Sequence, residues 1–135
     1  MYRIHTAVDF CYGHRLLDYE GPCQHLHGHN ARVEVILRGD TLDHRNFLYD
    51  FSELKDCLSE WVHKNFDHRM LLNKSDPVVL ALRELGEPVV LFDTNPTAEA
   101  IAKKIHDFFV EKNLPVEEVK VWENQKAWVS YGENS

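Results

Sequence analysis

The side chains best suited to chemistry lie in one short run, Cys23-Gln24-His25-Leu26-His27-Gly28-His29. In an extended backbone, residues two positions apart point to the same face, so His27 and His29 can present both imidazoles to one metal ion. Gly28 between them lets another backbone pass close. The spacing therefore predicts two ligands of a zinc site on one strand.

A catalytic zinc site needs a third protein ligand and an open position. His14 is the candidate, because it follows the aromatic-rich segment Phe10-Cys11-Tyr12-Gly13 and a neighbouring antiparallel strand would bring it to the other two. A single histidine is more typical of a surface or capping position, but a group of three favours a metal site. Periodicity alone does not choose among His25, His27 and His29, since all three follow the same alternation.

Cys23 has two interpretations at this level. One cysteine with three histidines can form a closed structural zinc site that has no chemistry. Gly21-Pro22 instead places Cys23 in a loop, where the thiol would lie near the metal without binding it. Cationic surroundings would then favour the thiolate, which is the nucleophilic or basic form.

The elements that must position these residues alternate between strand and helix patterns. The clearest strand is 30–38, in which Ala31, Val33, Val35 and Leu37 share one face. A helix capped by Asp50 or Ser52 should end near Asn65. The other expected elements are strands 2–10, 47–50, 88–92, 116–123 and 127–131, with a hairpin at 124–126, and helices starting at Asp76-Pro77 (closed by Gly86) and at Asn95-Pro96. This pattern predicts an α+β fold with an antiparallel sheet backed by two main helices.

Composition limits the class of protein. A chain of 135 residues with 44% hydrophobic content is expected to form a single domain, 1–135, with disorder only at Gly132 to Ser135. The net charge of -7 and the scattered Lys and Arg residues argue against nucleic-acid binding. Without a signal peptide or a membrane span, the expected location is the cytoplasm. The odd, widely spaced cysteines are expected to be reduced.

Several motifs together resemble the 6-pyruvoyltetrahydropterin synthase family, which includes the bacterial 6-carboxytetrahydropterin synthase of queuosine biosynthesis. The resemblance covers almost the whole chain. Departures from the family pattern are Phe66, where Leu is usual, an extra residue before Leu72, and Cys11-Tyr12-Gly13 in place of small residues. The matching segments are Phe10 to Leu16, Cys23 followed by His27-Gly28-His29, Asp50 to Lys55, Asp67-His68 ahead of Leu72-Asn73, Asn95 to Glu99, and Lys120 to Glu123.

The resemblance implies a role for each matched residue. It makes His14, His27 and His29 the zinc ligands and His25 a variable position. Cys23 becomes the catalytic base, and Asp67 and His68 complete a proton relay with it. Glu123 would anchor the pterin, and its place on the face of Val119 and Val121 agrees, because a carboxylate on an apolar face needs a partner. Thr97 would add a polar contact to the ring.

The same resemblance implies an assembly and an activity. The expected fold is the T-fold (tunnelling fold), with a four-stranded antiparallel sheet and two main helices on one face, and sheets forming a barrel in a trimer. Two stacked trimers would make a homohexamer with active sites between subunits. The expected substrate is 7,8-dihydroneopterin triphosphate, with 6-carboxy-5,6,7,8-tetrahydropterin as product. The alternatives are the 6-pyruvoyl product and a noncatalytic structural zinc-binding module.

Overall fold

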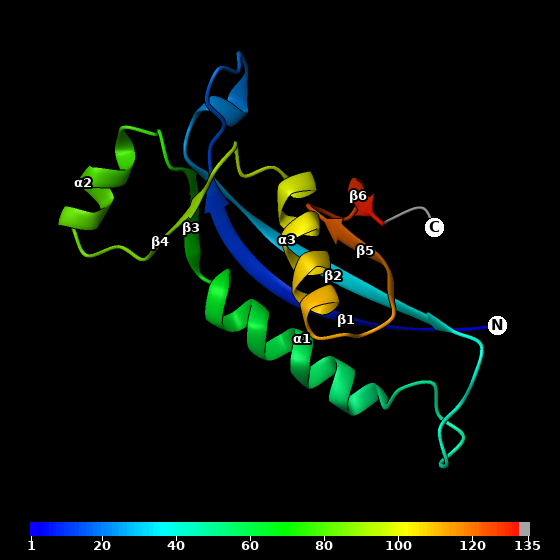
Figure 1. The fold of residues 1–135 in the computed structure, drawn as a ribbon. Helices are drawn as coiled ribbons and strands as arrows, with labels where there is room; N and C mark the ends of the chain where they lie inside the picture. Colours follow the sequence, from blue (N-terminus) through cyan, green and yellow to red (C-terminus); the bar gives the residue numbers. More distant parts are fainter. Residues whose placement is uncertain (133–135) are drawn as a thin grey trace.

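A curved sheet built around two long strands dominates the structure, a computed structural model in which residues 1–132 are described (Figure 1). β1 (Tyr2–His14) and β2 (His27–Gly39) pair antiparallel along their whole length. The sheet has six strands in the order β4-β3-β1-β2-β5-β6. Of the segment expected to be disordered, residues 133–135 lie outside the described residues. The shorter strands are β3 (Arg69–Asn73), β4 (Val89–Phe92), β5 (Val116–Trp122) and β6 (Trp128–Tyr131).

The expectation of a four-stranded antiparallel sheet is corrected in two respects. β1, β2, β5 and β6 do form an antiparallel unit. β3 joins the other edge of β1 in parallel, and β4 pairs parallel with β3, so the sheet has six strands and is mixed. Parallel strands are joined by crossovers rather than by turns, and no local sequence signal marks such a pairing.

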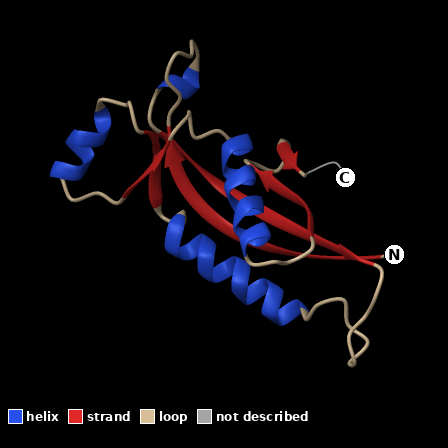
Figure 2. Ribbon diagram, in the orientation of Figure 1, coloured by secondary structure: helices blue, strands red, loops and turns tan. Residues whose placement is uncertain are grey.

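The helices divide into two that cover the sheet and one that does not (Figure 2). α1 (Phe51–Asn65) packs on β1, and α3 (Ala98–Glu111) packs on β5 and β6. The short α2 (Val78–Glu84) projects beside β4, away from the body of the sheet. None of the described helices combines the length and apolar content needed to cross a membrane.

The core lies between the sheet and the two main helices, as alternation predicted. The inner face of β2 is fully buried or nearly so at Ala31, Val33, Val35 and Leu37. α1 buries Leu54, Leu58 and Val62, and α3 buries Ile101, Ala102, Ile105 and Phe109. Asp50, one of the two candidate caps, accepts the backbone N–H groups of Ser52 and Glu53 and so starts α1.

The strand expected at 47–50 is absent, and that expectation was wrong. The stretch begins at the end of a turn in which the Asp43 carboxylate accepts the N–H groups of Arg45 and Phe47, and it continues as bends and irregular backbone up to α1. A side chain that satisfies local backbone donors removes the need for a partner strand. The sheet does contain β3, a segment in which no strand was expected.

Candidate metal centre

Strand register brings His14, His27 and His29 together. In the β1–β2 ladder His14 lies opposite His27, Tyr12 opposite His29, and Gly13 opposite Gly28. Residues that face each other across a ladder share a face, and so do residues two apart on one strand. All three imidazoles therefore lie on one face of the sheet. This is the arrangement that a neighbouring antiparallel strand was expected to produce.

The ring nitrogens of the three histidines converge. One nitrogen from each ring lies within 4.8 Å of the others, and the Nε2 atoms of His14 and His29 are 3.2 Å apart. Ligands held about 2.0–2.1 Å from a tetrahedral zinc are separated by about 3.3–3.4 Å. The spacing of these two nitrogens therefore fits two ligands of one zinc ion.

Backbone carbonyls orient two of the rings. His14 Nδ1 donates to the carbonyl of Pro96 at 2.7 Å, and His27 Nδ1 donates to the carbonyl of His25, also at 2.7 Å. A carbonyl only accepts, so each Nδ1 carries the proton and each Nε2 keeps its lone pair. The buried His27 Nε2 has no hydrogen-bond partner among the described residues. A lone pair left free in this way fits a metal ligand.

Burial favours the neutral form of His14 and His29, the form that metal binding requires. Desolvation lowers the pKa of His14 below its ordinary value, although the bond to Pro96 acts in the opposite direction. Desolvation also lowers the pKa of His29, with Glu123 opposing it. At neutral pH both rings are therefore available as ligands.

Glu123 lies against this centre rather than apart from it. Its Oε1 is 2.9 Å from His29 Nε2 and 3.5 Å from His14 Nε2. Val119 and Val121, which were expected to share its face, are fully buried. The carboxylate is thus placed where it can act on the metal centre and on a molecule bound next to it.

Cys23 and Thr97 share a small pocket with Glu123 and His14, of about 240 Å³. Cys23 lies in the short 3₁₀ turn Pro22–Gln24, and its carbonyl accepts the N–H of Leu16 at 2.9 Å. Its sulfur does not belong to the nitrogen cluster of the three histidines. Thr97 caps α3 by accepting the N–H of Ala100. The structure therefore brings Cys23, Thr97 and Glu123 to one side of the centre.

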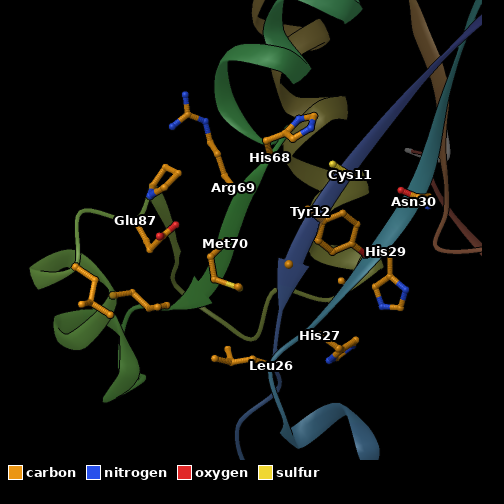
Figure 3. Close-up of a pocket in the computed structure, with 15 residues that line it drawn as sticks. Cys11, Tyr12, Leu26, His27, His29, Asn30, His68, Arg69, Met70 and Glu87 are labelled. Atoms are coloured by element: carbon orange, nitrogen blue, oxygen red, sulfur yellow. The ribbon is translucent and has the colours of Figure 1, made fainter.

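Asp67 and His68 lie elsewhere. His68 lines a cavity of about 700 Å³ together with His27 and His29, but at some distance along it (Figure 3). Asp67 and His68 also line an adjoining cavity of about 840 Å³ that includes neither Cys23 nor the three histidines. Within one chain, the expected relay of Cys23, Asp67 and His68 is not assembled.

Sequence reasoning missed the groups that support the centre. The Pro96 and His25 carbonyls orient ligands, and nothing in a side-chain pattern marks a backbone carbonyl for this role. Tyr12 packs edge-on to His14, with ring centroids 5.1 Å apart, and its buried hydroxyl has no described partner. Asn95 was noted only as a helix start, yet its side-chain oxygen accepts the Leu17 N–H and its amide donates to the Leu17 carbonyl. These bonds hold Pro96 beside His14.

Comparisons with known proteins cover nearly the whole chain. The profile of the family described as "6-pyruvoyl tetrahydropterin synthase" matches residues 3–134. A protein of Rickettsia typhi named 6-carboxy-5,6,7,8-tetrahydropterin synthase is 29% identical over 136 residues, covering 96% of this chain and 99% of its own.

Two solved structures show the same fold. An uncharacterized protein from Wolinella succinogenes superposes with a TM-score of 0.81 at 22% identity, covering 98% of both chains. The 6-pyruvoyl tetrahydropterin synthase of Caenorhabditis elegans superposes with a TM-score of 0.71 at 23% identity, covering 98% of this chain and 96% of its own.

Proposed function

Because the chain belongs to the 6-pyruvoyl tetrahydropterin synthase family, we propose that it is a zinc-dependent 6-carboxy-5,6,7,8-tetrahydropterin synthase. It would be a lyase that converts 7,8-dihydroneopterin triphosphate and water into the carboxylated tetrahydropterin, triphosphate and acetaldehyde. The observation that carries the proposal is the convergence of three imidazoles beside a pocket that holds a thiol and a carboxylate. The printed name of the Rickettsia typhi relative supports this product.

His14, His27 and His29 would hold the zinc, leaving an open position toward the pocket. When bound, the ion would supply a Lewis acid for the hydroxyl oxygens of the substrate side chain. The open position matters because a closed four-ligand site would have no room for substrate. Cys23 would leave this position open, because it shares the pocket but not the nitrogen cluster.

Glu123 and Thr97 would bind the pterin ring. The 2-amino group and ring N–H of a pterin are two parallel donors, which a carboxylate accepts as it accepts a guanidinium. In the structure Glu123 contacts the ligand nitrogens of His29 and His14. A histidine engaged as a ligand through Nε2 has no proton to donate there, so the carboxylate is then available to the ring.

Cys23 would remove a proton from the substrate side chain, and the Asp67–His68 pair would handle the second proton. His68 Nδ1 lies 3.1 Å from Asp67 Oδ1, so Asp67 orients the ring and stabilises its charged form while Nε2 transfers the proton. Because Cys23 and this pair line different cavities of one chain, the relay would combine residues from two chains. We therefore propose a homohexamer of two trimers, with each active site between subunits.

Product analysis tests the proposal directly. Purified zinc-loaded protein incubated with 7,8-dihydroneopterin triphosphate should yield a product with the mass of 6-carboxytetrahydropterin and release acetaldehyde. A product with the mass of the 6-pyruvoyl compound would instead support the second candidate, which the name of the C. elegans structure favours. If neither product forms although zinc is bound, the noncatalytic module would be favoured.

A further inference from the structure

A second group of metal-ligating side chains lies in the cavity of about 700 Å³, apart from His27. Figure 3 shows Cys11 and His68 together there, with Tyr12 and His29 between them and His27. A thiol from Cys11, a carboxylate oxygen from Asp67 and a ring nitrogen from His68 all lie within 4.8 Å of one another. None of these atoms belongs to the three-histidine centre.

A fourth donor lies next to this group. Asp67 Oδ1 accepts the Cys11 N–H at 2.9 Å and lies 3.1 Å from His68 Nδ1. Its other oxygen, Oδ2, is 3.3 Å from Nδ1 of His63, one helical turn earlier at the end of α1. The Asp67 carboxylate thus stands at the middle of one thiol and two imidazoles.

The backbone holds these residues in place. The backbone N–H of His68 donates to the Cys11 carbonyl at 2.8 Å, and the backbone N–H of Asp67 donates to the Val62 carbonyl at 2.9 Å. Together with the Cys11 N–H bond to Asp67, these contacts fix the turn after α1 against β1. The backbone of His68 is in the left-handed conformation, with φ of 58°. For a residue with a Cβ this conformation costs about 1 kcal/mol or more. The fold therefore keeps this turn in a conformation that a loose loop would avoid.

We propose that Cys11, His63, Asp67 and His68 form a second divalent-metal site of the zinc class. Thiolate, imidazole and carboxylate are the donors that zinc takes, and thiolate disfavours magnesium and calcium. Around a tetrahedral zinc these donors would lie about 3.3–3.6 Å apart. In the structure the atoms of Cys11, Asp67 and His68 are separated by up to 4.8 Å, so they would have to move closer. The side chains of His63 and His68 are 51% and 80% exposed, so rotation of both rings can close the site.

Occupation of this site has a consequence that rests on the proposed function. Asp67 and His68 cannot ligate a metal and transfer protons at the same time. The first equivalent of zinc, bound by the three histidines, should therefore support turnover, and a second equivalent should inhibit it. Cys11 and His63 have no part in the proposed catalysis. Substituting either of them should therefore remove the inhibition by the second equivalent.

Cobalt titration of the full-length protein tests the site without measuring activity. The metal-free protein is titrated with Co²⁺, and a thiolate-to-cobalt charge-transfer band is followed in the near ultraviolet. A three-histidine site contributes no such band. We expect the band to develop with the second equivalent, to disappear in Cys11→Ser, and to need about tenfold more Co²⁺ in His63→Gln. Cys57→Ser is the matched thiol control and should keep the band.

The outcomes separate this inference from the proposed function. A band that survives in Cys11→Ser but disappears in Cys23→Ser would overturn the second site and place the thiol ligand at the first. Saturation at one equivalent per chain, with no band, would also overturn it, whatever the protein does to dihydroneopterin triphosphate. His63 is exposed, so weaker binding of the second equivalent in His63→Gln, with the first unchanged, would support the site without a question of folding.

Discussion

At the residue scale, the contacts of His14 and His27 explain how ligands are selected from nine histidines. Each donates Nδ1–H to a carbonyl and turns Nε2 toward the centre. His25 supplies one of those carbonyls, so its backbone matters while its side chain is exposed. Alternation alone left His25, His27 and His29 equivalent. The difference is that His27 and His29 pair with β1 in the β1–β2 ladder, whereas His25 precedes β2.

The first prediction contrasts His25 with His27. His27→Ala removes a ligand atom and should weaken zinc binding by more than about 100-fold, since even supporting groups around a metal are worth 10–100-fold. His25→Ala keeps the carbonyl that His27 needs and should bind zinc like the wild type. Competition with a chromogenic chelator measures both. Equal zinc loss in the two variants would mean that the ligand set is wrong.

The second prediction concerns Cys23. If the thiol is a base beside the metal, Cys23→Ala should keep the zinc and the fold while turnover falls by about 10²–10⁴-fold, as for loss of a general base. Cys57→Ala, at a half-buried position on α1, is the matched control and should keep turnover. Zinc content and steady-state rates are measured on the same preparation. Zinc loss as severe as in His27→Ala would make Cys23 a structural ligand.

At the scale of elements, the β1–β2 ladder decides the geometry of the centre. Gly13 and Gly28 face each other between the two rungs that carry the histidines. A Cβ on Gly28 would lie 3.2 Å from the Tyr12 carbonyl, which is backbone and cannot swing aside. Gly28 was expected to allow another backbone to approach closely, and in the structure that backbone is Tyr12 of β1.

The third prediction follows from this crowding. Gly28→Ala should push β1 and β2 apart by a few tenths of an ångström and weaken zinc binding by about tenfold, while the sheet persists. Gly39→Ala, at the far end of β2, meets only the movable end of the Leu48 side chain and should leave zinc affinity unchanged. Circular dichroism and chelator competition check the two variants. Unchanged affinity in Gly28→Ala would show that the centre tolerates the displacement.

The fourth prediction concerns the ion pair between the end of β1 and the start of α2. Arg15 Nε donates to the buried Asp76 at 2.7 Å, and Asp76 also accepts the Val78 N–H. Asp76→Asn leaves Arg15 without its charge partner and should lower the free energy of unfolding by about 2–3 kcal/mol, below the range for a fully buried pair because Arg15 is partly exposed. Urea unfolding measures the change.

The same pair gives a pH dependence with a defined sign. The hydrogen bond from Arg15 holds the pKa of Asp76 below its ordinary value. Its contribution to stability is therefore complete above about pH 4, the unfolded value, and is lost as pH falls through the lower folded value. The stability difference between wild type and Asp76→Asn should shrink below pH 4. A difference that stays constant down to pH 2 would contradict this assignment.

Helices and antiparallel strands could be predicted because their signals are local. The 3.6-residue stripe and the cap at Asp50 defined α1, and alternation defined β2 and β5. The strand expected at 88–92 is β4, although it pairs in parallel, so parallel pairing alone does not hide a strand. β3 was not expected, because Arg69–Asn73 has neither the polar–apolar alternation nor the β-branched residues that are typical of strands. The three ligands lie just beyond the strands expected at 2–10 and 30–38. In the structure β1 continues to His14 and β2 begins at His27, and the pairing of these extensions brings the ligands together.

At the scale of the whole molecule, the separation of Cys23 from Asp67 and His68 bears on assembly. If each relay combines two chains, mixing inactive Cys23→Ala with inactive His68→Ala should restore activity. With equal amounts and random exchange in a symmetric oligomer, about a quarter of the sites would combine an intact Cys23 with an intact His68. Subunits are exchanged by mild denaturation and refolding, and turnover is compared with each variant refolded alone. Each variant mixed with itself is the control. No recovery in mixtures shown by mass to be heteromeric would place the relay within one chain.

The outer strands of the sheet, β4 and β6, have four residues each, and in the described part of the chain no further strand pairs with them. Open edges of this kind can add a foreign strand, and short length limits that risk without removing it. In an assembly that joins such edges, a foreign strand can add only in the interval after a chain has folded and before its edges pair with those of other subunits. Slow synthesis, which keeps partner chains scarce, would lengthen that interval, so recovery of soluble protein should depend on how quickly the chains accumulate.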